Sequence, residues 1–219
     1  MSTPTGPFAL RDPARGLTVF IVEDETDDRD ALAFHLMAMG HHVQAYGAAE
    51  PFLAALDPAI EGCVISNLHL PGLDGLALIT ELARRGSVLP VVVVTGDADV
   101  PLAVRAMKLG AVDFLEKPLA EGAIGETVQR ALQSARETAS LKRQAEAAAG
   151  RIATLSGRER DVFNGLVAGK LGKQIAYDLH ISPRTVEVYR ASTMEKLGVN
   201  TLSELVRLGI LTELHKSPL

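Results

Sequence analysis

Between Leu17 and Leu119 the chain repeats one pattern, a short apolar run followed by a segment whose apolar residues recur at helical spacing. Runs rich in Val and Ile that do not alternate with polar residues are typical of strands buried on both faces. Strands that alternate with helices indicate a parallel sheet covered on both sides. We therefore expect an α/β doubly wound domain with a five-stranded parallel sheet, whose strands lie at Leu17–Val22, Val43–Tyr46, Cys63–Ser66, Pro90–Thr95 and Val112–Glu116.

The last third of the chain shows no strand pattern and carries helix-start signals instead. Two capping boxes are present, at Ser156–Glu159 and at Thr201–Glu204. Ser182 is an N-cap residue placed directly before a proline at the first helical position. These signals predict an all-α domain of four helices with a tight turn at His180 between the middle two. That order of elements is a helix-turn-helix arrangement.

Charge divides the chain into two halves. Residues 17–136 carry 8 Lys/Arg and 17 Asp/Glu, a net charge of −9, whereas residues 154–219 carry 9 and 7, a net charge of +2. Such a difference suggests two domains with different partners. The Ala-rich stretch between them contains no proline, and we interpret it as a helix rather than a flexible tether. The expected parts are a disordered tail (1–16), an α/β domain (17–136), a helical linker (137–153), a helix-turn-helix domain (154–212) and a second tail (213–219).

Composition narrows the class of protein. With 47% hydrophobic and 22% charged residues the chain is ordinary for a soluble protein, and no apolar run approaches the roughly 20 residues that span a bilayer. The single cysteine, Cys63, lies in an apolar run and predicts a buried thiol, so no disulfide framework can form. The six histidines have no metal-ligand spacing. We expect a cytoplasmic protein with no membrane partner.

Polar side chains stand at the ends of four of the expected strands. They are Glu23, Asp24, Asn67, Thr95 and Lys117. Because the carboxyl ends of parallel strands meet at one edge of the sheet, these groups should share one pocket. Two carboxylates suit a hard cation such as Mg²⁺, and a hydroxyl with an ammonium group suits a phosphoryl group.

Short motifs in each of the two expected domains resemble those of known protein families. Glu23-Asp24, the segment N-L-H-L-P-G-L-D-G from Asn67, Thr95-Gly96 and F-L-E-K-P from Phe114 are similar to the receiver domain of bacterial response regulators, which has a flavodoxin-like fold. The segment S-P-R-T-V-E-V-Y-R from Ser182, with Q-I-A from Gln174, is similar to the LuxR-type helix-turn-helix. Together the two resemblances cover Leu17 to about Leu211 in the layout of FixJ-type transcription regulators.

The resemblance implies roles for the pocket residues. Glu23, Asp24 and the backbone carbonyl of His69 would ligate Mg²⁺, and Lys117 would contact the phosphoryl group. Thr95 and Phe114 would form the switch pair, and the Lys117-Pro118 peptide bond would be cis. As a phosphorelay output of a two-component system, the protein would receive its signal from a sensor kinase or another regulatory protein.

Asn67 departs from the family pattern, in which the phosphoacceptor is an aspartate. A carboxamide has no anionic oxygen that could attack phosphorus, so the acyl-phosphate route is closed. Losing one negative charge beside Glu23 and Asp24 should also weaken Mg²⁺ binding. We therefore expect a pseudo-receiver that needs no cofactor, binds Mg²⁺ weakly if at all, and is not an enzyme. A second interpretation is an ordinary phospho-receiver in which Asn67 is an engineered replacement of the acceptor.

The helix that begins after Ser182 is expected to enter the DNA major groove. Arg184, Glu187, Val188 and Ala191 share one face of it and are the candidates for base contacts, whereas Val186 and Leu197 fall on the core side. Lys173, Arg190 and Lys196 are the candidates for phosphate contacts. The complete set of predicted DNA-binding residues is Lys173, Ser182, Arg184, Thr185, Glu187, Val188, Arg190, Ala191 and Lys196.

The weak positive charge of the second domain implies modest affinity per monomer, so a homodimer on paired half-sites is expected. The last helix, with Leu202, Leu205, Val206 and Leu208, offers an apolar dimer surface, and some of these residues must instead pack the small core. The function expected is a DNA-binding transcription regulator that works without aspartyl phosphorylation. The alternative from another class is a protein-interaction module that sequesters a related regulator or kinase.

Overall fold

A computed structural model of the chain describes residues 17–57, 59–120 and 122–216, and it divides into two compact units, 1–139 and 140–219. The expected tail 1–16 lies outside the described residues. The first unit contains a five-stranded parallel sheet with the strand order β2-β1-β3-β4-β5. The strands are β1 (Thr18–Val22), β2 (His42–Tyr46), β3 (Gly62–Asn67), β4 (Val91–Thr95) and β5 (Ala111–Glu116). The prediction of a doubly wound α/β sheet is confirmed.

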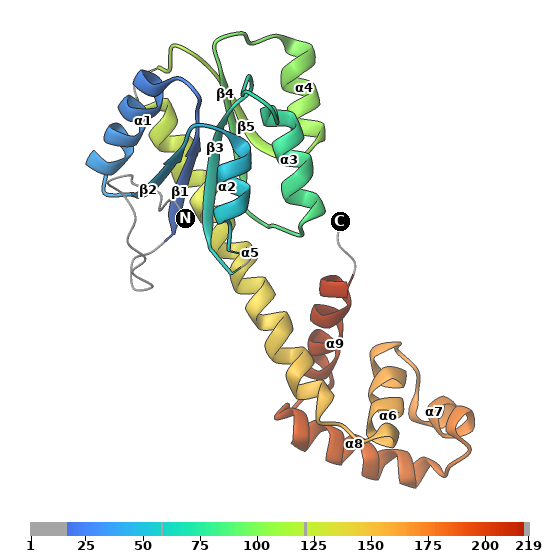
Figure 1. The fold of residues 1–219 in the computed structure, drawn as a ribbon. Coiled ribbons are helices and arrows are strands. Elements are labelled where there is room, and N and C mark those ends of the chain that lie inside the picture. Colours follow the sequence, from blue (N-terminus) through green and yellow to red (C-terminus); the bar gives the residue numbers. More distant parts are fainter. Residues whose placement is uncertain (1–16, 58, 121, 217–219) are drawn as a thin grey trace, which may run out of the picture. The chain divides into compact units, whose positions relative to one another are not determined.

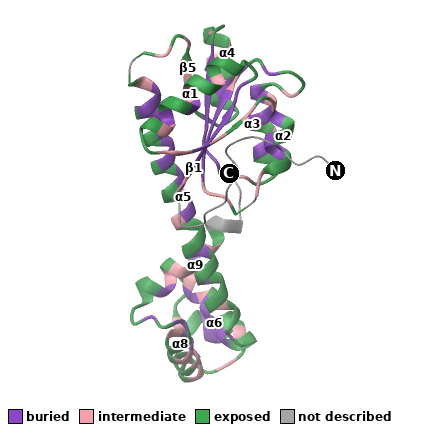
Figure 2. Cartoon of the chain, turned by 60° about the vertical axis from the view of Figure 1, so that its left-hand side comes forward, coloured by how far each residue is buried: buried purple, intermediate pink, exposed green. Residues whose placement is uncertain are grey.

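The strands pair in parallel, with one shift of register between Val91 and Val92 where β4 meets β5. Thr18 of β1 pairs with His42 of β2 and with Gly62 of β3, and Asn67 of β3 pairs with Val94 of β4. The central strands are buried on both faces, as their continuous apolar composition requires. Figure 2 shows this as purple strands inside a shell of half-exposed helices.

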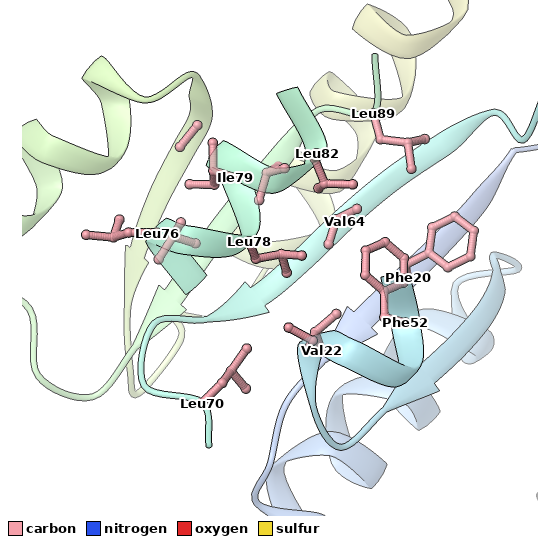
Figure 3. Packing of buried hydrophobic residues seen from close by; sticks show 14 of the residues in the cluster. Phe20, Val22, Phe52, Val64, Leu70, Leu76, Leu78, Ile79, Leu82 and Leu89 are labelled. Carbon is pink, nitrogen blue, oxygen red and sulfur yellow. The ribbon is translucent and has the colours of Figure 1, made fainter. Parts of the chain in front are cut away.

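Helices cover both faces of the sheet (Figure 1). One face packs against α2 (Ala49–Ala55), α3 (Gly75–Arg84) and α4 (Val100–Lys108). The other packs against α1 (Thr26–Ala38) and the first part of α5 (Ala123–Ala153). In Figure 3, Leu78 and Leu82 of α3 lie over Val64 of β3. The Phe52 ring of α2 tilts against Phe20 of β1, with 5.4 Å between the ring centroids.

The second unit contains α6 (Gly157–Val167), α7 (Gly172–Leu179), α8 (Pro183–Leu197) and α9 (Leu202–Lys216). A separate apolar cluster holds them together, and its fully buried members include Val162, Val186, Leu197 and Leu205. The predicted core side of α8, Val186 and Leu197, is therefore confirmed. His180 adopts a left-handed conformation (φ 54°, ψ 44°), which ends α7 and makes the turn before α8.

Two element boundaries differ from those expected. α5 begins at Ala123 rather than near Leu119, because Pro118 and the positive φ of Gly122 (79°) delay its start. α5 then continues to Ala153 as one helix of 31 residues, so the linker is helical as expected. α9 runs to Lys216, past the expected domain end at 212, because no proline intervenes before Pro218. The part of the expected second tail beyond Lys216 lies outside the described residues.

Candidate functional site

The pocket predicted at the edge of the sheet is built where four strands end. Glu23 follows β1 directly, Asn67 is the last residue of β3, Thr95 is the last of β4 and Lys117 follows β5. The turn after β3 is tight, because Gly75 of α3 packs against the Asn67 backbone so closely that a Cβ there would lie 2.4 Å from the Asn67 carbonyl oxygen. Asp74 caps α3 by accepting a hydrogen bond from the Ala77 amide. Local backbone packing thus fixes the position of Asn67.

The Asn67 side chain connects the predicted metal ligands to one another. Its Nδ2 donates hydrogen bonds to Glu23 Oε1 at 3.1 Å, to Asp24 Oδ1 at 3.0 Å and to the backbone carbonyl of His69 at 3.0 Å. Glu23 is only 3% exposed and belongs to the buried polar groups of the unit. Ser66, next to Asn67, is fully buried and its hydroxyl donates to the Asn67 carbonyl, so it does not face the pocket.

Lys117 also lies in this pocket and is bonded to two carboxylates. Its Nζ donates to Glu23 Oε2 at 2.9 Å and to Asp28 on the first turn of α1. Partial burial would by itself lower the pKa of Lys117, but the hydrogen bonds from the ammonium group to Asp28 and Glu23 outweigh it and raise that pKa. The ammonium charge is therefore retained and neutralised inside the protein. Asp28 was not among the residues selected from the sequence.

The predicted switch pair lies beside the pocket. Thr95 is fully buried, and its Oγ1 accepts a hydrogen bond from the Asp97 amide at 3.2 Å. Phe114 is half-buried and packs against the apolar cluster on the α3 and α4 side of the sheet. The Lys117-Pro118 peptide bond is cis, as the resemblance implied. The residues predicted for this pocket are thus brought together at one edge of the sheet.

The arrangement does not fit a Mg²⁺ ion as it stands. A metal ion needs oxygen lone pairs directed at it, whereas Glu23, Asp24 and the His69 carbonyl are occupied by the Asn67 Nδ2 donor. Within the described part of the chain, no three side chains of His, Cys, Asp or Glu gather closely enough to hold a metal ion. Mg²⁺ would have to displace the amide nitrogen to bind.

The recognition surface of the second unit is organised by the start of α8. Ser182 accepts a hydrogen bond from the Thr185 amide, and its hydroxyl lies 2.8 Å from the Thr185 hydroxyl. Arg184, Glu187, Val188 and Ala191 are all exposed on one face of α8, as expected, and Val188 is 63% exposed. In Figure 2, most of α8 has the colours of intermediate and exposed residues.

Two of the predicted phosphate contacts have partners inside the protein. Lys196 Nζ donates to Glu159 Oε2 at 2.8 Å, and Arg190 lies 3.6 Å from Glu187 in an ion pair along α8. Glu159 also accepts from Ser192 and from the Ser156 amide, so it joins α6 to α8. Lys173 is exposed at the start of α7. Lys196 therefore has a structural role within the domain besides any contact to phosphate.

Beside α8, the helix α7 carries an exposed aromatic residue that was not predicted from the sequence. Tyr177 on α7 is 82% exposed, which is unusual for an aromatic side chain. It lines a shallow hollow together with Lys170, Lys173, Gln174 and Asp178, and Lys170 donates a hydrogen bond to Asp178 at 2.7 Å. Alternating basic, amide and aromatic groups suit a nucleic-acid backbone. The signal available in the sequence was the spacing of Lys173 and Tyr177 at i and i+4, which puts them on one helical face.

Comparison with known families assigns each unit to a class. Residues 19–129 match the response regulator receiver domain, and residues 153–208 match the bacterial regulatory proteins of the luxR family. A receiver joined to a LuxR-type DNA-binding domain defines a two-component response regulator that regulates transcription. Within the described residues, no helix is long and apolar enough to cross a membrane.

Individual relatives extend over nearly the whole chain. The transcriptional regulatory protein FixJ of Bradyrhizobium diazoefficiens is 45% identical over 192 residues, covering 88% of this chain and 94% of its own. FixJ of Azorhizobium caulinodans is 46% identical over 195 residues, covering 89% and 92%. Among solved structures, full-length FixJ from B. japonicum is 43% identical with a TM-score of 0.56 over 92% of this chain and 99% of that one. StyR is 33% identical with a TM-score of 0.74 over 92% and 100%. The chain belongs to the FixJ-type response regulators.

Proposed function

We propose that this transcription regulator works without aspartyl phosphorylation, because Asn67 stands at the acceptor position. The observation that carries the proposal is the chemistry at the end of β3. Asn67 offers an amide whose nitrogen donates to Glu23, Asp24 and the His69 carbonyl, and no carboxylate stands in its place. An amide is a poor nucleophile toward phosphorus. The receiver would then be held in one state or switched by a protein partner, with a sensor kinase as one candidate.

The experiment uses the full-length protein and its Asn67→Asp variant. Each is incubated with a small phosphodonor and Mg²⁺, and intact mass is measured promptly because acyl phosphates hydrolyse. We expect no phosphoryl adduct on the wild-type chain and one adduct on the variant, mapped to residue 67. An adduct on the wild-type chain within this pocket, for example on Asp24, would contradict the proposal. Failure of the variant to accept a phosphoryl group would contradict the assignment of position 67.

DNA binding by the second unit follows from its family, and the residues responsible are part of the proposal. Arg184, Glu187, Val188 and Ala191 would read base edges. Lys173, Arg190 and Lys196 would contact phosphates, and Ser182 and Thr185 would hold the start of α8 toward the DNA backbone. The exposure of the first four residues and the exposed Lys173 support this assignment.

We further propose that the protein binds DNA as a homodimer. Two exposed apolar surfaces support this. On α9, Leu202 is 41% and Ile210 is 48% exposed, whereas Leu205 is buried in the domain core. On α4 and β5 of the receiver the exposed apolar residues are Val100, Val104, Met107, Leu109 and Val112. Exposed apolar groups that gather on one face commonly mark a protein interface.

Selection of genomic DNA fragments by the unmodified protein, repeated with Asn67→Asp, tests the regulatory proposal. Nanomolar, salt-sensitive and sequence-dependent binding by the wild-type chain would support a regulator that is active without phosphoryl transfer. Selection by the variant alone, after phosphodonor treatment, would show that the wild-type receiver holds the protein in an inactive state. Failure of both proteins to select any site would favour a module that sequesters another regulator.

A further inference from the structure

The Asn67 amide nitrogen contacts the same three groups that are expected to bind Mg²⁺. One nitrogen atom lies within 3.0 to 3.1 Å of Glu23 Oε1, Asp24 Oδ1 and the carbonyl oxygen of His69. These are the three groups that the receiver resemblance makes Mg²⁺ ligands. A primary amide has two N–H groups, so three acceptors share two protons and one proton is bifurcated.

The charges around Asn67 determine which way its amide faces. If the side chain were rotated by half a turn, the Oδ1 atom would face two carboxylates and a carbonyl with no proton between them. That arrangement is repulsive, since like partial charges would meet in a partly buried pocket. With a divalent cation among the three oxygens the preference is reversed, because the cation repels N–H groups and attracts Oδ1. The amide nitrogen and a cation therefore exclude each other.

Neighbouring groups complete the acidic pocket without a metal. The second oxygen of Glu23 accepts from Lys117, which also bonds to Asp28. The first oxygen of Glu23 accepts from the Glu25 amide at 3.3 Å as well as from Asn67. No buried side-chain nitrogen or oxygen among the described residues lacks a hydrogen-bond partner. The carboxylates of Glu23 and Asp24 thus each accept a hydrogen bond from within the chain, without a cation.

We propose that the Asn67 amide takes the place of the divalent cation and blocks its site, so that the receiver is closed in a metal-independent form. The amide joins the loop after β1 to the loop after β3, which a bound metal would otherwise join. This inference deepens the proposed function and rests on it only in taking position 67 as the former acceptor. Mg²⁺ binds to this pocket only when the Asn67 side chain turns away.

A blocked site and a simple loss of charge predict different orders of Mg²⁺ affinity among variants of position 67. If Asn67 were only a weaker ligand than aspartate, removing it altogether with Asn67→Ala would lower the affinity for Mg²⁺ further. If the amide blocks the site, Asn67→Ala opens it and the affinity rises. The expected order of affinity is therefore Asn67→Asp, then Asn67→Ala, then wild type, with about tenfold between the last two.

Titration calorimetry with MgCl₂ on the three full-length proteins measures this order directly, and melting temperatures in EDTA and in Mg²⁺ provide a second readout. We expect the wild-type melting temperature to be the same in both buffers, and that of Asn67→Ala to be lower in EDTA and to rise with Mg²⁺. Wild-type affinity equal to or above that of Asn67→Ala would overturn the proposal. The order of Mg²⁺ affinities is measured without a phosphodonor. The titration can therefore contradict the blocked site while the phosphorylation experiment supports the proposed function, and the opposite outcome is equally distinguishable.

A measurement on the wild-type chain alone covers the case in which Asn67→Ala does not fold. The side-chain NH₂ signals of Asn67 can be assigned in an ¹⁵N spectrum as those absent from the Asn67→Asp spectrum. A blocked site predicts slow exchange of these protons with solvent and no displacement of their signals by millimolar Mg²⁺. Rapid exchange, or saturable shifts at low Mg²⁺ concentration, would show that the amide does not occupy the site.

Discussion

The receiver pocket and the outer face of α8 differ in where their polar side chains find partners. In the pocket, Asn67, Glu23 and Lys117 bond to one another and to nearby acidic groups. On α8, Arg184 and Val188 face solvent, and the structure records no hydrogen bond for the Arg184 side chain within the described residues. Because the polar atoms of the pocket already bond to one another, few of them can bind a small ligand. The Arg184 guanidinium can exchange water for DNA, whereas Arg190 pairs with Glu187 along the same helix.

The largest effect is expected from breaking the receiver pocket with Lys117→Ala. The change leaves the buried Glu23 carboxylate with one fewer donor, and losing a partner of a buried charge costs about 2–3 kcal/mol. Urea unfolding followed by circular dichroism checks the loss in the free energy of unfolding. Lys108→Ala, at the exposed end of α4, is the matched control and should change little. A Lys117→Ala protein as stable as wild type would show that the pocket does not depend on this ion pair.

A loss of similar size is expected for Arg184→Ala, in the free energy of DNA binding rather than of unfolding. A base contact by arginine contributes about 1–3 kcal/mol of discrimination, so affinity for a selected site should fall about 5- to 150-fold. Binding to unrelated duplex should fall much less. Fluorescence anisotropy on both duplexes makes the comparison, with Arg158→Ala on α6 as the control in the same unit. Equal losses on both duplexes would assign Arg184 to the DNA backbone instead.

A smaller effect is expected at the start of α8. Ser182→Ala removes the N-cap bond to the Thr185 amide, which costs about 1 kcal/mol of stability. The melting temperature of the second unit should fall accordingly, whereas Ser203→Ala, exposed within α9, should leave it nearly unchanged. If Ser182→Ala also weakens DNA binding beyond this loss of stability, the Ser182 hydroxyl contacts DNA as well as capping the helix.

The smallest effect is expected on the stability of the second unit at acid pH. It tests whether hydrogen bonds of a carboxylate within the chain also stabilise this unit. Hydrogen bonds to Lys196, Ser192 and the Ser156 amide lower the pKa of Glu159 to about 2 from an ordinary 4.5. The stabilisation is therefore complete above pH 4.5 and is lost as pH falls toward 2. Glu159→Gln should flatten the dependence of melting temperature on pH in this range. Glu81, whose pKa Arg84 and Arg85 lower to about 2 at the surface of α3, is the control, and Glu81→Gln should have the weaker effect.

Most of the fold could be predicted from the sequence because the signals are local. All five strands lie within one residue or so of their expected bounds, and Ser156 and Ser182 begin the helices that their capping signals indicated. Cys63 is fully buried as expected, and burial raises the pKa of its thiol to about 12. Periodicity and capping depend on neighbours in the chain, which a sequence displays directly.

What could not be predicted depends on residues far apart in the chain. The bond from Lys196 to Glu159 spans 37 positions, and the bond from Lys117 to Asp28 spans 89. Neither has a local pattern that would reveal it. The sequence also places Asn67 in the pocket without showing which amide atom faces the carboxylates, because that depends on the oxygens that surround it in three dimensions.

The retained surroundings of Asn67 have a genetic consequence. Codons for asparagine and aspartate differ by one base, and Glu23, Asp24, Thr95 and Lys117 already stand where a receiver pocket has them. A single transition in the gene would restore the carboxylate, and the same product would arise by hydrolysis of the amide in the finished protein. Under the proposed function, a carboxylate acceptor at position 67 would thus be a single chemical or genetic step away.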